Sequence, residues 1–177
     1  MKLQKNSKLA AAFGLMLLST SAVAAPDMSC LTPALDAELG SKFQYIDDLT
    51  ALISQNRPDL AESVVIQAAS GKARHEYRWS RVMWLLEVTP ERMTTPADIW
   101  AIKWSDEDQL AWQTASPDHE TLQEEFDSKN ASLKDMPNRD SFLDFMQIIR
   151  QDPDYIQVTE QFRAQNSALR DAVADCY

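Results

Sequence analysis

The chain has 177 residues, and its content of 45% hydrophobic and 25% charged side chains is typical of a folded globular protein. Its three glycines provide no glycine-rich loop for a nucleotide phosphate, and two histidines with two cysteines are too few for a multi-histidine metal centre, an iron–sulfur cluster or a covalently attached haem. From these counts we expect no metal and no cofactor. The formal net charge of −10 disfavours binding to nucleic acids, so we also expect no nucleic-acid partner.

Residues 1–24 have the pattern of a cleaved secretory signal peptide: a basic start, an apolar run over residues 9–18, and Ala22-Val23-Ala24 as a peptidase site. We therefore expect a single helical domain over residues 25–177 and a periplasmic or secreted protein without a membrane span. Cleavage removes three lysines, which leaves 14 basic side chains against 27 acidic ones and a net charge of −13. Such a charge would attract a basic partner.

Proline follows a helix-capping residue at four places, and proline in the first turn is a common helix start. The pairs are Thr32-Pro33, Thr95-Pro96, Ser116-Pro117 and Asp152-Pro153. Apolar residues recur every three or four positions over 35–53 and with helical spacing over 158–176, which predicts long amphipathic helices. The sequence therefore predicts an all-α bundle of six to seven helices.

Three shorter runs complete this prediction. Val64-Val65-Ile66 leans towards β structure, but its alanine-rich surroundings favour a helix that ends at Gly71. Residues 82–86 and 142–146 are apolar on nearly every side, which is typical of buried central helices.

Cys30 and Cys176 lie near the two ends of the expected mature chain. An even number of cysteines in an exported protein favours a disulfide, here one that joins the termini. A pair of free or intermolecular thiols is the alternative. Because the two residues do not form a Cys-x-x-Cys pair, we expect a structural role rather than a redox one.

Arg74, Arg78 and Arg81 share one face of a predicted helix and form the only concentrated positive surface of the chain. Such arginines either neutralise acids of neighbouring helices or bind an anionic group of a partner. All three are therefore candidate partner-binding residues, and both interpretations stay open at this point.

Glu87 follows five apolar residues and is the one candidate catalytic residue. A carboxyl that lost its hydration there could act as a general acid, as a glutamate does in helical glycan-cleaving enzymes of the lysozyme type. Pairing with an arginine, or contact with solvent, is the alternative. Asp118-His119-Glu120 is a weaker metal candidate, because successive residues on a helix point in different directions, and no metal site is predicted.

The segment 105–127 is strongly acidic and contains no lysine or arginine. Its acids are Asp106, Glu107, Asp108, Asp118, Glu120, Glu124, Glu125 and Asp127. Ser105 followed by three acids is a typical helix start, which accounts for part of this charge. The remainder predicts a surface for a basic protein partner. The candidate contact residues are Asp106, Glu107, Asp108, Glu120 and Glu124.

Five tryptophans lie within residues 79–112, and aromatic residues at helical spacing are usually part of a core. Trp112 is the exception, because Asp108, Gln109 and Gln113 surround it with polar groups. An aromatic side chain beside an acidic rim is typical of a binding hot spot, so Trp112 is a further candidate contact.

These patterns favour an exported, non-enzymatic binding protein that inhibits or neutralises a basic partner, as immunity proteins and lysozyme inhibitors do. A small helical cell-wall hydrolase that uses Glu87 is the first alternative. A chaperone-like or structural periplasmic protein is the second.

Overall fold

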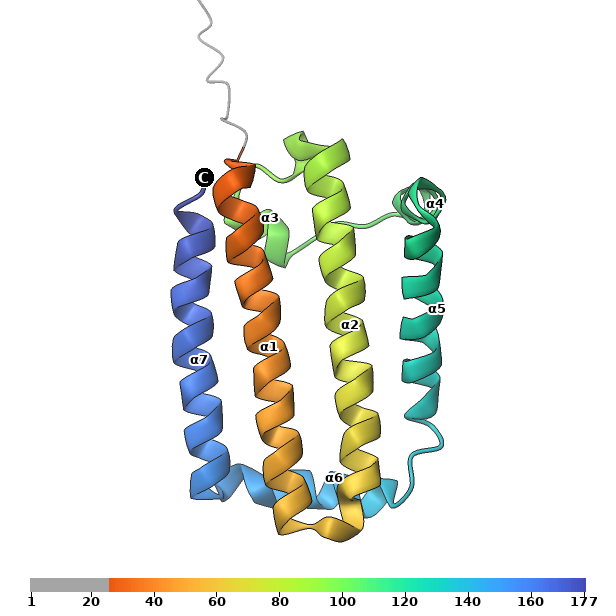
Figure 1. The fold of residues 1–177 in the computed structure, drawn as a ribbon, viewed down its shortest axis with the longest axis vertical. Helices are drawn as coiled ribbons and strands as arrows, with labels where there is room; N and C mark the ends of the chain where they lie inside the picture. Colours follow the sequence, from red (N-terminus) through yellow and green to blue (C-terminus); the bar gives the residue numbers. More distant parts are fainter. Residues whose placement is uncertain (1–25) are drawn as a thin grey trace, which may run out of the picture.

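The computed structural model describes residues 26–177, so the predicted signal peptide lies outside the described residues. Within this range the chain forms seven α-helices and no β-strand, as the sequence predicts (Figure 1). The helices are α1 (Met28–Asn56), α2 (Ala61–Val88), α3 (Pro96–Trp100), α4 (Asp106–Ala115), α5 (Pro117–Ser132), α6 (Arg139–Ile148) and α7 (Pro153–Ala174). None of these helices combines the length and the apolar character that crossing a bilayer requires.

Four of the helices stand side by side in the order α7, α1, α2 and α5 (Figure 1). α1 packs against both α7 and α2, and the other side of α2 packs against α5. α6 crosses one end of this row, while α3, α4 and the C-terminus lie towards the other end. α5 is therefore an edge helix, with much of its surface open to solvent.

Three of the four predicted helix starts are confirmed. α3, α5 and α7 begin at the predicted prolines, after Thr95, Ser116 and Asp152 as capping residues. The start at Thr32-Pro33 is wrong, because α1 already begins at Met28 and Pro33 lies inside it. The carboxylate of Asp27 caps α1 by accepting a hydrogen bond of 2.9 Å from the backbone N–H of Ser29.

α2 confirms the predicted helix over Val64-Val65-Ile66 but does not end at Gly71, as the sequence suggested. Gly71 lies where α1 comes close to α2, and a Cβ atom added there would be 3.3 Å from Cδ1 of Ile46. The missing side chain therefore serves the packing of two helices rather than the end of one.

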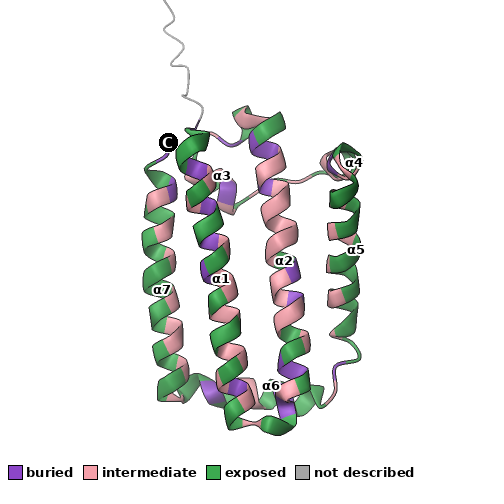
Figure 2. Ribbon diagram, viewed as in Figure 1, coloured by how far each residue is buried: buried purple, intermediate pink, exposed green. Residues whose placement is uncertain are grey.

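Most of the buried apolar residues form two clusters at opposite ends of the row, and Trp112 and Ala73 lie outside both (Figure 2). The disulfide-end cluster contains Leu31, Leu35, Val82, Leu85, Leu86, Met93, Ile99, Val173 and Cys176. The α6-end cluster contains Ile53, Leu60, Val64, Met136, Phe142 and Ile149. The middle of the row has fewer buried apolar side chains, so the core is divided rather than continuous.

The two runs predicted as central helices have different outcomes. Residues 82–86 do enter the core, with Val82, Leu85 and Leu86 buried. The prediction for 142–146 is wrong, because α6 crosses the end of the row and buries only one side. Phe142 is buried there, whereas 47% of the surface of Leu143 is exposed.

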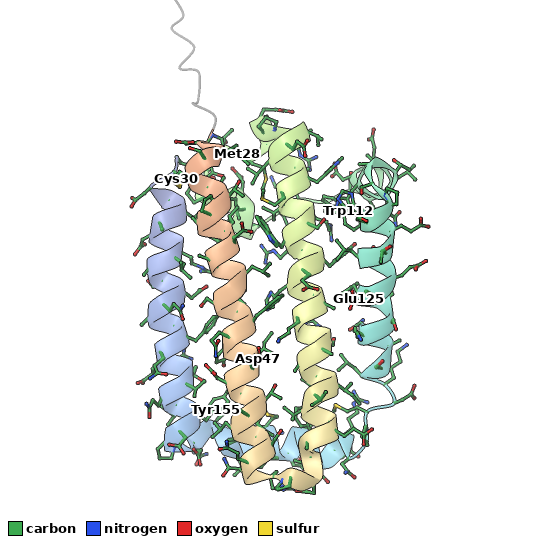
Figure 3. All side chains as sticks on the ribbon, in the orientation of Figure 1. Met28, Cys30, Asp47, Trp112, Glu125 and Tyr155 are labelled. Atoms are coloured by element: carbon green, nitrogen blue, oxygen red, sulfur yellow. A yellow bond between two sulfur atoms is a disulfide. The ribbon has the colours of Figure 1, made fainter. Side chains whose placement is uncertain are left out.

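Cys30 and Cys176 form the predicted disulfide, with their Cα atoms 5.6 Å apart. The bond links the first turn of α1 to the end of α7, at the end of the molecule where Figure 3 labels Cys30. Beside it, the backbone N–H of Asp27 donates a hydrogen bond of 3.0 Å to the carbonyl of Cys176. The two ends of the described chain are therefore held together covalently and by the backbone.

Candidate functional site

The acidic segment begins with a tightly bonded helix start. The Ser105 hydroxyl accepts a hydrogen bond of 3.1 Å from the backbone N–H of Asp108, whose carboxylate accepts one of 2.9 Å from the backbone N–H of Ser105. Arg92 donates two more hydrogen bonds to this carboxylate, of 2.7 and 3.1 Å. These bonds hold the pKa of Asp108 well below its usual range. The predicted helix start is thus confirmed, and Asp108 is engaged within the fold.

The other acids of the segment are exposed, and we call them the acidic edge. They are Asp106, Glu107, Asp118, Glu120, Glu124, Glu125 and Asp127. Within residues 26–177, none of these carboxylates lies within 4.0 Å of a lysine or arginine nitrogen. α5 has no buried residue (Figure 2), so its acids point into solvent along the edge of the row.

Negative charge also crowds the contact between α5 and α2. Glu76 lies on α2, and Glu125 faces it from the α5 side, where Figure 3 labels it. Burial and, after it, the Glu125 carboxylate raise the pKa of Glu76. The Glu76 and Glu125 carboxylates repel each other when both are ionised, so a cationic group brought to this edge would relieve the repulsion.

Trp112 lies in the interior rather than on the surface, with none of its surface exposed. Its indole N–H donates a hydrogen bond of 3.3 Å to the Ser80 hydroxyl, and its ring stacks on His119 with the ring centres 4.6 Å apart. Tyr77 and Trp104 pack edge-on against it at 5.4 and 6.3 Å. The expectation that Trp112 offers an exposed aromatic contact is therefore wrong.

Gln109, one of the polar neighbours that suggested an exposed Trp112, makes its hydrogen bonds within the fold. Gln109 accepts hydrogen bonds of 3.0 Å from the Tyr77 hydroxyl and 2.8 Å from the Trp104 indole, and it donates one of 2.9 Å to Gln123. A partly buried aromatic with a polar tip needs such a partner. Gln109 thus joins α2, α4 and α5 rather than marking a surface.

Leu110 is the apolar residue that α4 presents to solvent, with 64% of its surface exposed. The sequence pattern pointed to Trp112 instead, because polar residues surround Trp112 in the sequence. The signal was available, since positions 110 and 112 are about 200° apart on a helix with 100° per residue, so only one of them can face inwards. Leu110 therefore takes the place of Trp112 as the apolar group beside the acidic edge.

The three candidate arginines do not form a common anion-binding surface. Arg78 donates hydrogen bonds of 2.9 and 2.6 Å to the carbonyls of Ile99 and Trp100. The guanidinium of Arg81 lies 3.8 Å from the ring centre of Trp104, and burial lowers the pKa of Arg81. Arg74 is the exposed member of the three. Arg78 and Arg81 thus hold the fold together through carbonyls and an aromatic face, which neither sequence interpretation anticipated.

Glu87 is exposed at the end of α2, so it lacks the buried setting that the general-acid hypothesis requires. It borders a surface hollow of about 510 Å³ together with Trp84 and His119, and no second carboxylate lines that hollow. Glycoside hydrolysis ordinarily uses two carboxyl groups. The hollow therefore does not have the composition of a glycosidase site.

His119 serves the aromatic cluster rather than a metal. Its Nδ1 lies 2.7 Å from the carbonyl oxygen of Trp112, within hydrogen-bonding distance, while its ring stacks on the Trp112 indole. Across residues 26–177, no group of three or more histidine, cysteine or acidic side chains is placed to hold a metal ion.

The site is thus an exposed acidic surface on a framework of buried aromatic and arginine contacts, with an exposed leucine beside it. Comparison of the chain with protein-family models, with curated proteins and with solved structures found no match.

Proposed function

We propose that the chain is an exported binding protein that inhibits or neutralises a basic protein through the acidic edge. The observation that carries this proposal is the set of seven exposed carboxylates that have no ion pair within the described residues. Asp106, Glu107, Asp118 and Glu120 lie in the first turns of α4 and α5, where a negative charge favours the helix dipole. The acids further along α5, Glu124, Glu125 and Asp127, have neither this role nor an ion pair within the described residues. Uncompensated charge of one sign accelerates encounter with a partner of opposite sign.

The surroundings of the acidic edge suit this role. Trp112, Tyr77 and Gln109 anchor α4 and α5 to α2, so the carboxylates are held in place before a partner arrives. Leu110 adds an exposed apolar group on α4. In this arrangement the acids steer the approach of the partner, and Leu110 contributes to the affinity of the complex.

The test begins with capture of a partner on the oxidised protein from periplasmic and secreted fractions at physiological salt. Association rates with that partner are then measured for the double variant Glu120→Lys/Glu124→Lys. We expect the association rate constant to fall at least tenfold and its salt dependence to flatten, because steering by opposite charges is lost. A Leu110→Ala variant should instead raise the dissociation rate.

The matched control is Glu160→Lys/Asp171→Lys, which makes the same change of charge on exposed positions of α7 at the opposite edge of the row. It should alter the association rate less than threefold, since a change of net charge alone acts weakly at this distance in physiological salt. Equal effects of the two double variants would show that net charge, not the acidic edge, governs binding and would contradict the proposal. So would the absence of any retained basic protein.

A further inference from the structure

A cavity of about 410 Å³ lies between α1 and α2, on the opposite side of α2 from the acidic edge. α6 contributes Phe142 and Met146 to its walls, and α7 contributes Phe162. Its volume is within the range of small-molecule sites, roughly 300–1,000 Å³. It extends from the middle of the row to Ile53, Val64 and Phe142 of the α6-end cluster.

The walls of this cavity are mostly apolar. They include Ile46, Leu49, Ile53, Val64, Phe142 and Phe162. Ala68 and Gly71 make room along α2, because larger side chains at these positions would occupy the space. An alkyl chain placed here would exchange water for apolar contact along its length.

Among the polar side chains in the middle of the walls, Tyr45 and Thr50 have partners within the protein, and Gln67 is exposed to solvent. The Thr50 hydroxyl donates a hydrogen bond of 2.7 Å to the carbonyl of Ile46, and the Tyr45 hydroxyl lies 3.4 Å from that of Thr159. These groups therefore need no polar ligand, and the centre of the cavity suits an apolar chain.

The end of the cavity nearer the disulfide is positively charged. Lys42 and His75 line it, and the Lys42 ammonium lies 2.6 Å from the buried carboxylate of Glu38. Burial, and then the charges of Lys42, Arg78 and Arg74, lower the pKa of His75 to about 4. The imidazole is therefore neutral at pH 7, and Lys42 is paired with Glu38. Arg74 and Arg78 do not line the cavity, but their charges act on His75 and make the surroundings of this end net positive.

We propose that this cavity binds a single-chain amphiphile with an anionic head group, specifically a free fatty acid. The alkyl chain lies between α1, α2 and α7, and the carboxylate lies at the Lys42–His75 end. Charge complementarity selects this occupant over a neutral or cationic amphiphile, and apolar walls around a volume of about 410 Å³ suit one alkyl chain. The site is separate from the acidic edge, so this inference does not depend on the proposed function.

The first test uses dodecanoate as the probe, titrated into the oxidised protein at pH 7 and followed by calorimetry. We expect saturable binding of one molecule per chain. Dodecanol and dodecyltrimethylammonium should bind at least tenfold more weakly, which corresponds to about 1.4 kcal/mol. Equal affinities for the three probes would overturn the proposal, as would the absence of saturable dodecanoate binding.

His75 gives a readout that a non-specific apolar interaction would not change. A carboxylate at the Lys42–His75 end favours the protonated imidazole, so dodecanoate should raise the pKa of His75 in an NMR titration, whereas dodecanol should not. The charged groups around His75 are Lys42, Arg74 and Arg78, with Glu38 paired to Lys42, and the titration stays above about pH 5 so that the carboxylate of the probe remains largely ionised. An unchanged pKa at saturating dodecanoate would overturn the placement of the head group.

Variants locate the chain and the head group separately. Ala68→Phe fills the cavity and should weaken dodecanoate binding at least tenfold, while Ala164→Phe, at an exposed position of α7, should not. The double variant Glu38→Gln/Lys42→Met removes the cation that lines the cavity together with the carboxylate paired to it. The net charge of this end is then unchanged, and only the direct contact of the head group with Lys42 is lost. It should weaken binding of dodecanoate but not of dodecanol. Dodecanoate binding that survives Ala68→Phe in a folded protein would overturn the proposal.

Discussion

The two ends of the molecule are held together by different means. The disulfide-end cluster combines a covalent link between α1 and α7 with a buried core, beside which lie Trp104, Trp112 and Arg81. The α6-end cluster has fewer buried residues, borders the cavity, and leaves Leu143 and Ile148 exposed by 47% and 69%. One end is therefore covalently cross-linked, whereas the other is held by side-chain packing.

This difference matches the two proposed sites. α4, with Leu110 and the first acids of the acidic edge, lies at the disulfide end, where a fixed surface reduces the entropy lost on binding a protein. The cavity lies towards α6, where fewer packed contacts oppose the entry of a small molecule. Entry of a small molecule into a cavity requires a local opening of the structure, and such openings occur most readily in the least stable parts of a fold.

The largest expected effect comes from Cys30→Ser/Cys176→Ser. The disulfide closes a loop with a sequence separation of 146 residues, and the chain-entropy model gives such a bond about 5 kcal/mol. We expect the free energy of unfolding, measured with urea, to fall by about that amount. Backbone amides near the disulfide, such as Leu31 and Val173, should then exchange as fast as those at the α6 end.

Reduction of the unmodified protein is the control for this variant, because it removes the cross-link without a substitution. The two should agree in stability and in the pattern of hydrogen exchange. A loss below 1 kcal/mol, or faster exchange confined to α6, would contradict the view that the disulfide end is the more stable one.

A pair of core truncations compares the packing of the two ends. Trp112→Ala removes an enclosed side chain with none of its surface exposed, and we expect a loss of about 4 kcal/mol. Phe142 lines the cavity, so part of its ring has no packed neighbour to lose, and we expect a smaller loss for Phe142→Ala, about 3 kcal/mol. Thermal and urea unfolding of both variants measure the difference. A larger loss for Phe142→Ala would reverse the comparison of the two ends.

Leu110→Ala is the matched control on α4. Because Leu110 is 64% exposed, its truncation should change the free energy of unfolding by less than about 0.5 kcal/mol. A strong destabilisation by this variant would mean that Leu110 belongs to the core and is not available to a partner.

Much of this fold follows from local sequence signals. Prolines after capping residues mark the starts of α3, α5 and α7, and two cysteines in a chain with a predicted export signal favour the bond between α1 and α7. These signals act over a few residues or through simple counting. The extension of α2 through Gly71 could not be predicted in this way, because it depends on the approach of Ile46 from another helix.

The candidate site was less predictable from the sequence, because it also depends on contacts between segments that are far apart in the chain. The acids of the segment 105–127 are visible in the sequence, but which of them is engaged depends on Arg92, which comes from a distant turn. Trp112 looked exposed because its neighbours are polar, yet Gln109 turns inwards to bind Tyr77 and Trp104. The cavity has no local signal, since its walls come from four helices that only the fold brings together.

Helix caps at the two ends allow a further comparison, with smaller expected losses than the core truncations. Asp152 caps α7 at the α6 end by accepting hydrogen bonds from two backbone N–H groups, and Asp152→Ala should cost about 1 kcal/mol. Asp108 caps α4 at the disulfide end and also binds Arg92, so Asp108→Ala should cost more, about 2 kcal/mol.

The pH dependence of stability tests the part of this difference that comes from Arg92. Because Arg92 lowers the pKa of Asp108 in the folded protein, its contribution is complete above the ordinary aspartate pKa of about 3.9 and is lost as the pH falls towards the lower folded value. The unfolding free energies of the parent protein and of Asp108→Ala should therefore differ at pH 7 and converge only as the pH falls well below 3, towards the folded pKa of Asp108. The matched variant Asp106→Ala keeps the Arg92 pair and should stay close to the parent protein at both pH values. If the difference between the parent protein and Asp108→Ala persisted unchanged at low pH, the cap and not the ion pair would account for the whole effect. The Arg92–Asp108 ion pair would then contribute nothing to the stability of the disulfide end.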